Sequence, residues 1–418
     1  MGATQTKQPC YEVVVLGAGY AGLMAALRLR RRRQPLRIAL VNARTEFVER
    51  VRLQEAIVAA VAPRIPAIAA LLAGTSIDFI RATVTALDAD AHRVHVATED
   101  EERAIAFDHA VYALGSTIAV DAVAGVAQHA YRLEPGSGAR SVAALRSRLG
   151  EEGGRALRVV VAGGAETGIE AAAEIKTAWP QHRVMLISRS RCGQFKGARV
   201  EAAARRALAH LGVELIDREA VIEVGRDGVA TARGRSIASD ICVWSGGVQA
   251  PPLAAAAGLA TDPQGRILVD ANLRSISHPD IRAVGDAAHP LAPTGAPYRL
   301  SAFAALASGA YAADAILAQR AGALLPPFSF STFGQGIAIG RGGVGFVSYP
   351  DDRQRLFLIR GASARQLRNF FVWLVCGVLR MERRFPGLFF WPGRRRVSWQ
   401  QANEAAAKQE AVGAPRAA

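Results

Sequence analysis

A glycine-rich turn near the N-terminus constrains the fold of this chain more than any other feature. The apolar run that ends at Leu16 is followed by Gly17, Gly19 and Gly22, and then by an Ala- and Leu-rich stretch. The spacing G-x-G-x-x-G predicts a buried strand, a tight turn that lets the backbone approach a pyrophosphate, and a helix packed on the strand. The free N–H groups at the start of that helix would bind the phosphates. We therefore expect a dinucleotide-binding fold here.

A second predicted strand, from Leu36 to Val41, belongs to the same fold. Asn42 follows it, twenty residues beyond Gly22, where an acidic side chain normally binds the ribose hydroxyls. An amide can still bond one hydroxyl, so this position lacks the usual charge but keeps a hydrogen-bonding group.

The pattern recurs after a second Val-rich run, at Gly163, Ala165 and Gly168. Alanine replaces the middle glycine, and its methyl group should loosen or shift the pyrophosphate at the point of closest approach. The next predicted strand, Arg183 to Ile187, ends at Ser188, again twenty residues beyond the last glycine. A second dinucleotide-binding fold is therefore expected.

The end of that strand bears on the choice of nucleotide. Ser188 and Arg189, with Arg191 nearby, stand where an acidic residue is expected. Without a carboxylate the site tolerates a 2′-phosphate better, so NADPH is at least as plausible as NADH. The alternative is that both arginines are solvated surface charges.

A third motif identifies one of the two ligands as a flavin. The segment from Asp280 to His289 is typical of a short strand that ends in Gly285-Asp286 at the start of a helix. A carboxylate there can accept hydrogen bonds from the ribityl hydroxyls of FAD, while the helix end faces the pyrophosphate. Together the three motifs predict separate sites for FAD and for NADPH or NADH.

Composition narrows the class of protein. A length of 418 residues suggests two or three domains, and 50% hydrophobic residues provide a large core. The net charge of +15 favours anionic partners, and we expect nucleotide phosphates rather than nucleic acid. Four widely separated cysteines exclude a redox-active dithiol, and no metal site is expected. We see neither a signal peptide nor a run of roughly 18 apolar residues, so a cytoplasmic or peripheral protein is predicted.

With these motifs the chain resembles the pyridine-nucleotide-dependent flavoproteins with two dinucleotide-binding domains, especially type II NADH dehydrogenases and apoptosis-inducing-factor-like flavoproteins. Further stretches that support the resemblance are 47–53, 107–116, 240–248 and 265–270. It implies an α/β fold with two Rossmann-like domains, the second inserted in the first. The expected limits are 11–119 and 269–324 for the FAD-binding domain, 120–268 for the NAD(P)H-binding domain, 325–399 for a C-terminal region, and 400–418 for a disordered tail.

The resemblance also implies site residues. Hydride would pass from NAD(P)H to FAD, with Glu170 facing the nicotinamide; the alternative is a first-turn glutamate that stabilises the helix dipole. The cofactor-binding residues would be Gly17, Gly19, Tyr20, Ala21, Gly22, Asn42, Ala43, Arg44, Arg52, Val84, Ala113, Gly115, Gly285, Asp286, Gly163, Gly164, Ala165, Thr167, Gly168, Ser188, Arg189 and Gly247.

The expected acceptor site departs from that family. Its membrane quinone reductases carry Ala-Gln-x-x-x-Gln after the Gly-Asp motif, and here Phe303 and Ala307 stand at the glutamine positions. Neither side chain can bond a quinone carbonyl, but an apolar pocket lined by Phe303 could take a flat aromatic acceptor. Gln54, in the strip beside the flavin, is the other substrate candidate, with a structural role as the alternative.

The C-terminal region is basic and aromatic. Residues 351–400 hold eleven arginines against three acidic residues, together with three of the five tryptophans. This composition suits either the surface of an anionic membrane or a helix that packs on the flavin domain or a dimer partner.

The sequence thus predicts a flavoprotein oxidoreductase that passes electrons from NAD(P)H through FAD to a small quinone-like or other aromatic acceptor. One alternative is an FAD enzyme that acts directly on an organic substrate, with a degenerate nicotinamide domain. The other is a flavin-bearing interaction protein with slow turnover.

Overall fold

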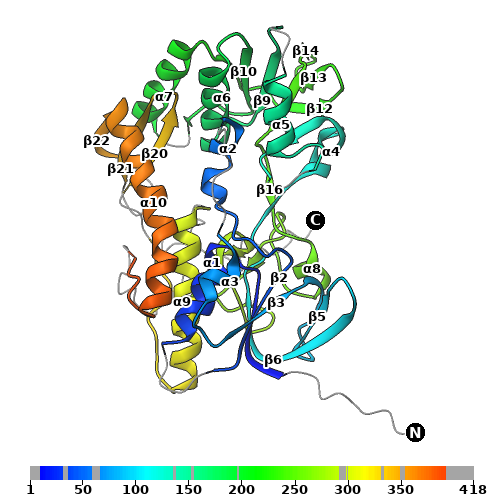
Figure 1. The fold of residues 1–418 in the computed structure, drawn as a ribbon, viewed down its shortest axis with the longest axis vertical. Coiled ribbons are helices and arrows are strands. Elements are labelled where there is room, and N and C mark those ends of the chain that lie inside the picture. The colour runs from blue at the N-terminus through cyan, green and yellow to red at the C-terminus, as the bar shows by residue number, and fades with distance from the viewer. Residues whose placement is uncertain are drawn as a thin grey trace, which may run out of the picture.

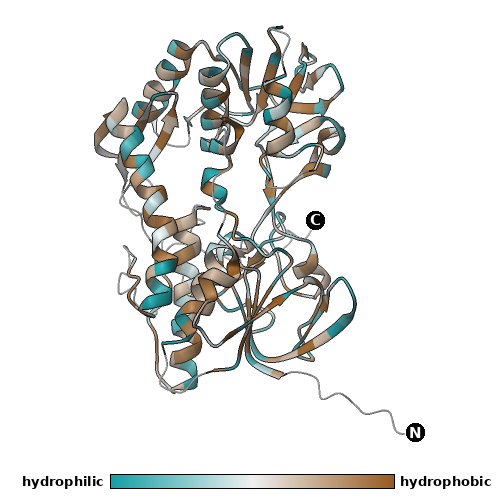
Figure 2. Ribbon diagram, viewed as in Figure 1, coloured by the Kyte–Doolittle hydropathy of each residue, from teal (hydrophilic) through white to brown (hydrophobic). Residues whose placement is uncertain are grey.

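The computed structural model describes residues 10–31, 36–58, 66–134, 138–151, 155–194, 197–290, 298, 300–330, 334–348 and 354–391. Its two main sheets lie one above the other in Figure 1, and the C-terminal elements join them along one side. Figure 2 shows that apolar residues are concentrated in the central strands of both sheets. The predicted α/β architecture with two dinucleotide-binding folds is confirmed.

The lower sheet in Figure 1 forms around the completely buried run from Val13 to Leu16. Its strand order is β3-β2-β1-β6-β5-β4, and β18 pairs with β6. The strands are β1 Cys10–Leu16, β2 Ile38–Asn42, β3 Ile77–Arg81, β4 Thr83–Asp88, β5 Arg93–Ala97, β6 Glu102–Tyr112 and β18 Ile281–Ala283. Strands β1, β2, β3, β6 and β18 are parallel, whereas β4 and β5 form an antiparallel extension.

Two long helices pack against each other on this sheet's half of the molecule. Helix α1 (Tyr20–Leu29) follows the first glycine turn, and α9 (Ala302–Arg320) follows the Gly-Asp motif. Gly309 makes their close approach possible, because a Cβ there would lie 2.2 Å from the carbonyl oxygen of Ala21. The first glycine turn and the Gly-Asp turn, both predicted to bind FAD, are therefore held together by one helix pair.

The upper sheet is entirely parallel, in the order β11-β10-β9-β15-β8. Its strands are β8 Ala130–Arg132, β9 Arg158–Ala162, β10 Arg183–Ser188, β11 Glu214–Asp217 and β15 Ile241–Trp244. Helices α5 (Val142–Leu149), α6 (Glu166–Ala178) and α7 (Ala198–Leu211) accompany it. A small antiparallel sheet adds β12 Val221–Val224, β13 Gly228–Thr231 and β14 Ser236–Ala238.

The two halves are connected by short elements. Strands β7 (Thr117–Ile118) and β16 (Val248–Gln249) pair antiparallel where the chain crosses between the sheets. The 3-10 turn η1 (Arg50–Arg52) and helix α2 (Glu55–Val58) leave the lower half, and α2 packs on α5 and α6 of the upper one. The other short elements are α3 Ile68–Leu72, η2 Val120–Ala122, α4 Val126–His129, α8 Leu253–Ala256, β17 Ile267–Leu268, η4 Gly285–Ala287 and β19 Ala288–His289. The predicted domain limits stay predictions.

The C-terminal region contacts both halves. The antiparallel strands β20 (Gly334–Ile339), β21 (Gly342–Ser348) and β22 (Gln354–Arg360) pack beside α6 and α7. Helix α10 (Ala362–Arg384) then runs downward in Figure 1 and packs on α1.

A buried ionic cluster fixes the far end of α10. The Arg28 guanidinium of α1 donates two 3.0 Å hydrogen bonds to Asp314 of α9 and one of 3.2 Å to Glu382 of α10. Glu382 is completely buried and also accepts hydrogen bonds from the backbone N–H groups of Gly387 and Phe389. Because breaking a buried ion pair leaves an uncompensated charge, this cluster holds the three helices in one arrangement.

Two sequence expectations need correction, and one open alternative is decided. Gly285-Asp286 begins a single 3-10 turn rather than a helix, because β19 follows at once and pairs with β17. Helix α9 is long and apolar enough to cross a membrane, contrary to the expectation of no such run; 67% of its most apolar window is buried inside the protein. For Trp391, the packing alternative holds rather than the membrane one, because the residue is buried and its indole N–H donates to the Ser329 carbonyl oxygen at 2.9 Å. The predicted tail, 400–418, lies outside the described residues.

Candidate functional site

The first glycine turn has the shape that a bound pyrophosphate requires. Gly17 has a φ of +99°, and a Cβ there would lie 2.5 Å from the carbonyl oxygen of Ala113. A Cβ at Gly22 would lie 1.8 Å from the carbonyl oxygen of Gly17. At Gly19, in contrast, a Cβ would meet no protein atom within 4 Å, and no side chain caps the start of α1. The N–H groups at the start of α1 therefore have no side-chain cap, and their contact with the phosphates of FAD stays a prediction.

Asn42, at the end of β2, is hydrogen-bonded to the chain at both ends of its amide. Its Oδ1 accepts from the Ala18 N–H at 3.0 Å, and its Nδ2 donates to the Arg44 carbonyl oxygen at 2.8 Å. An amide oxygen has a second lone pair, so Asn42 keeps one acceptor for a ribose hydroxyl. Its ribose contact stays a prediction.

The Gly285-Asp286 turn joins three segments at the same end of the lower sheet. Gly285, with a φ of +65°, donates its N–H to the Ser308 hydroxyl of α9 at 3.0 Å. The Asp286 carboxylate accepts a 2.8 Å hydrogen bond from the Ser116 hydroxyl, and Arg50 donates to the Ser116 carbonyl oxygen at 2.7 Å. A half-buried carboxylate held in this way is suited to accept the ribityl hydroxyls of FAD.

The second glycine turn has a geometry similar to that of the first. Gly163 has a φ of +128°, and a Cβ at Gly168 would lie 1.8 Å from the carbonyl oxygen of Gly163. The residues that precede the two helices also share a conformation, with φ −77° and ψ −168° at Gly19 and φ −83° and ψ 180° at Ala165. The exposed methyl group of Ala165 is therefore the main difference where NAD(P)H would approach.

At the end of β10, Ser188 is buried, and a Cβ on Gly164 would lie 2.3 Å from its hydroxyl oxygen. Ser188 thus fills space behind the glycine turn. Arg191 forms an ion pair with Glu201 at 2.6 Å, whereas Arg189 is exposed beside the end of the strand. The basic character expected for the ribose end of the site thus resides in Arg189.

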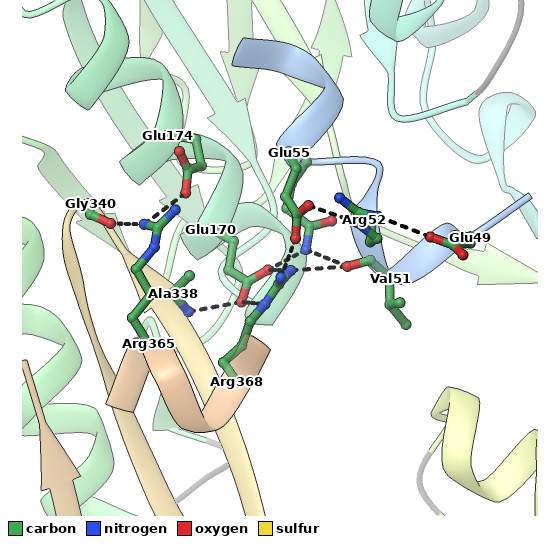
Figure 3. A network of polar contacts seen from close by, with 11 residues as sticks. Glu49, Val51, Arg52, Glu55, Glu170, Glu174, Ala338, Gly340, Arg365 and Arg368 are labelled. Atoms are coloured by element: carbon green, nitrogen blue, oxygen red, sulfur yellow. Dashed lines mark hydrogen bonds and ion pairs between the residues drawn. The ribbon is translucent and has the colours of Figure 1, made fainter. Parts of the chain in front are cut away.

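Glu170 of α6 lies in a buried polar network, drawn in Figure 3. Its Oε1 accepts from the Ala338 N–H of β20 at 2.8 Å and from Arg368 Nε at 3.3 Å. Its Oε2 accepts from Arg368 Nη2 at 3.1 Å and from the Gln54 amide. Burial raises the pKa of Glu170, and Arg368, the Ala338 N–H and Gln54 each act to lower it. The fold thus brings together two of the predicted site residues, Glu170 and Gln54.

Arg368 was missed by sequence reasoning. It is 6% exposed and also bonds Glu55 of α2 and the Val51 carbonyl oxygen, the latter at 3.0 Å. No sequence signal identifies it, because one arginine in an Arg-rich amphipathic segment resembles a solvated charge. Only the three-dimensional arrangement shows that it contacts both halves of the molecule.

The acceptor candidates lie at the start of α9. Phe303 is half-buried and meets Phe371 of α10 edge-on, with ring centroids 6.2 Å apart. Ala307 is completely buried, so its side chain contributes to the core. At position 307 an apolar side chain packed in the core therefore replaces the glutamine, and Ala307 itself offers no polar group.

The remaining predicted residues lie around these turns. Arg52 is paired with Glu49 and Glu55, and Tyr20 is buried edge-on against Phe47. For the other predicted residues the structure gives burial or backbone conformation. Ala21 and Ala113 are buried, Val84 is half-buried, and Ala43, Arg44 and Thr167 are exposed; Gly115 and Gly247 have positive φ angles. Their contacts with cofactors stay predictions.

The cysteines and the potential metal ligands bear on the expectations of no dithiol and no metal site. All four cysteines are unpaired, and burial raises the pKa of the Cys192, Cys242 and Cys376 thiols to about 12. Within the described ranges, no group of three His, Cys, Asp or Glu side chains is arranged to hold a metal ion.

Comparison with known proteins agrees with this geometry. An NADH dehydrogenase-like protein of Mycobacterium tuberculosis is 33% identical over 297 residues, which cover 66% of this chain and 72% of that protein. The demethylphylloquinone reductase of Synechocystis is 26% identical over 345 residues, 79% of this chain and 85% of the relative. The fold matches the sulfide:quinone oxidoreductase of Aquifex aeolicus with a TM-score of 0.75 at 18% identity, over 91% and 93% of the two chains.

The family model that matches residues 11–309 is that of the pyridine nucleotide-disulphide oxidoreductases. The match includes both glycine turns and the Gly-Asp turn described above. This chain therefore belongs to the pyridine nucleotide-disulphide oxidoreductase family and is an FAD-dependent NAD(P)H oxidoreductase.

Proposed function

We propose that this flavoprotein reduces a quinone, or a closely similar flat aromatic acceptor, at the expense of NAD(P)H. Conversion of a quinone to a quinol takes two electrons and two protons; NAD(P)H supplies a hydride, and solvent supplies the second proton. Bound FAD would carry the two electrons from donor to acceptor. The protein's contribution is to hold the two dinucleotides and to admit the acceptor.

The observation that carries this proposal is a continuous series of aromatic rings between α9 and α10. Trp373, 68% exposed, stacks on Phe370 at 6.0 Å, and Phe370 lies 6.0 Å from Phe371. Phe371 in turn contacts Phe303, which lies five residues before Ser308, the α9 residue that accepts a hydrogen bond from the Gly285 N–H. Aromatic side chains favour a flat, apolar ligand by offset stacking and edge contacts. The rings therefore form an apolar cluster from the exposed Trp373 to Phe303, and we propose that the acceptor packs against it.

The printed names of two relatives support the choice of acceptor. The Synechocystis relative is a demethylphylloquinone reductase, and a Staphylococcus aureus relative is named type II NADH:quinone oxidoreductase. Both names describe quinone reduction, which we extend to this chain. The lack of glutamine at positions 303 and 307 means that shape and stacking, rather than amide hydrogen bonds, would hold the quinone here.

We further propose that α10 rests on an anionic membrane surface, where lipid-soluble quinones reside. Phe370, Trp373, Gly377, Arg380 and Arg384 follow one another at spacings of three and four residues, so they share one side of the helix. Except for the half-buried Gly377, all are exposed. Aromatic residues followed by arginines suit the boundary between acyl chains and acidic headgroups. A homodimer stays a prediction.

Anaerobic stopped-flow absorbance tests the donor half of the proposal. The FAD-loaded protein is mixed with NADH or NADPH, and we expect the visible flavin absorbance to bleach within seconds. Mixing the bleached protein with a soluble naphthoquinone should restore the colour faster than mixing with air-saturated buffer. Failure of both donors to bleach the flavin would favour direct action on an organic substrate instead.

The Phe303→Ala and Phe371→Ala variants test the acceptor half. Both should slow recovery of colour by the naphthoquinone while leaving bleaching by NAD(P)H unchanged. Binding to vesicles of phosphatidylglycerol, compared with phosphatidylcholine, tests the membrane proposal, and Trp373→Ser should weaken it. Equal binding of both lipids, or of neither, would contradict an anionic membrane surface as the docking site.

A further inference from the structure

We infer that Arg368 of α10 is a positioning residue for hydride transfer, which pairs with the Glu170 carboxylate and fixes it between the two dinucleotide-binding halves. The inference rests on the proposed function, because it assumes that NAD(P)H binds beside Glu170. It assigns the C-terminal helix a part in the reductive step as well as in acceptor entry.

The position of Arg368 follows from a close contact between α10 and β20. A Cβ at Gly336 would lie 2.7 Å from Arg368 Cβ and 3.0 Å from its backbone nitrogen, so only glycine lets the helix approach this strand so closely. From there the guanidinium extends into the network of Figure 3. Its planar fork reaches Glu170 with Nε and Nη2, and Glu55 with Nη1. This bidentate geometry is specific to arginine, since lysine offers a single point charge.

The same guanidinium is linked to the flavin motif through η1. Arg368 Nη2 donates to the carbonyl oxygen of Val51, whose neighbour Arg50 donates to Ser116, and the Ser116 hydroxyl donates to Asp286. Gln54, two residues after η1, donates its amide both to Val51 and to Glu170. One short segment, 50–55, therefore contacts Ser116, the hydrogen-bond donor to Asp286, at one end and Glu170 at the other.

Arg368 is the principal counter-ion of Glu170. The charged groups that surround Glu170 come from three elements: Glu55 of α2, Glu174 of α6, and Arg365 and Arg368 of α10. Arg365 donates to Glu174 at 3.3 Å and to the Gly340 carbonyl oxygen, so it is engaged one turn away. Without Arg368, burial would favour the protonated form of Glu170, since desolvation raises its pKa. A protonated Glu170 would bind the Gln54 amide and the Ala338 N–H more weakly, and the segment beside the flavin would lose its fixed position.

The test is the pH profile of flavin bleaching by saturating NAD(P)H. The wild-type rate should depend less on pH than the rate of Arg368→Gln, because Arg368 lowers the pKa of Glu170. Arg368→Gln should be slower than wild type by at least about tenfold at the lowest pH at which the protein stays folded, as expected when a reacting group is misplaced, and should recover as rising pH ionises Glu170. Arg368→Lys should lie between the two. The double variant Arg368→Gln with Glu170→Gln should be slow at every pH, because it has lost the titrating group.

Arg365→Gln is the matched control, since it removes an arginine from the same helix, one turn earlier, without touching Glu170. It should keep the wild-type pH profile. An Arg368→Gln variant whose rate falls by the same factor at every pH would show that Arg368 acts through packing alone. An unchanged rate would overturn the inference outright.

A second readout needs no electron donor. A buried carboxyl whose folded-state pKa is raised stabilises the folded protein at low pH, and that stability is lost as the pH rises. The deficit in unfolding temperature of Arg368→Gln relative to wild type should therefore be small at pH 5 and larger at pH 8. A deficit that does not change with pH would contradict the pairing. If NAD(P)H does not bleach wild-type flavin, the proposed function fails, while this measurement still tests the ion pair.

Discussion

Replacement of Asp286 by alanine provides a direct test of the flavin site. The Asp286 carboxylate is half-buried and is held by the Ser116 hydroxyl at 2.8 Å. A hydrogen bond to a charged group contributes about 1.5–3 kcal/mol. Loss of one such bond from the ribityl chain should weaken FAD binding by roughly 10- to 150-fold, since every 1.4 kcal/mol is a factor of ten.

The assay is a titration of flavin-free protein with FAD, followed by the change in flavin fluorescence, together with the flavin content of the purified protein. Asp286→Asn keeps one acceptor oxygen and should lose less affinity than Asp286→Ala. Asp90→Ala makes the same change of charge at a side chain that is 96% exposed, and it should bind FAD like the wild type. An Asp286→Ala dissociation constant within about twofold of the wild-type value would refute the assignment of this carboxylate to the flavin.

Three further outcomes are expected. Ala165→Gly should lower the KM for NAD(P)H several-fold in steady-state assays, because the backbone there already matches Gly19 and only the methyl group differs; a higher KM would count against phosphate contact at this turn. Arg189→Glu should lower the ratio of kcat/KM for NADPH to that for NADH by at least about tenfold, since a carboxylate repels a 2′-phosphate; an unchanged ratio would leave Arg189 as a surface charge. Asp240, whose pKa is lowered to about 2 by hydrogen bonds from Arg158, stabilises the folded protein above its unfolded pKa and loses that effect as the pH falls toward 2. Asp240→Asn should therefore reduce unfolding temperature at pH 7 but not at pH 2, and an equal reduction at both would exclude the ion pair as its cause.

The parts of the site that are local in sequence could be predicted, because each is a short segment with its own pattern. The two glycine turns and the strands that flank them have the predicted bounds to within a few residues, since G-x-G-x-x-G fits one backbone path and needs no distant partner. The sequence alone also shows that no acidic residue stands at the end of β10. It does not show that Ser188 is buried there, because that burial depends on how closely Gly164 approaches it.

The parts that depend on long-range packing could not be predicted. Arg368 reaches Glu170 from 198 residues away, and nothing near either residue indicates the partner. The exposure of the C-terminal aromatic residues could not be predicted either. Trp391 and Trp373 look alike in sequence, yet one is buried beneath Ser329 and the other is largely exposed. Which aromatic faces outward is decided by the path of α10 across the two halves.

The cluster of Arg28, Asp314 and Glu382 has a consequence for how the chain matures during translation. Arg28 lies in the first helix to be synthesised, and its partner Glu382 is 354 residues later. Until α10 has left the ribosome, the first dinucleotide fold therefore contains a cation in its interior that lacks one of its two counter-ions. Long-range contacts of this kind slow folding, because the intervening chain must be ordered before they form. We expect the nascent flavin-binding half to remain loosely packed and dependent on chaperones until α10 docks, so that its maturation follows the completion of the C-terminal helix.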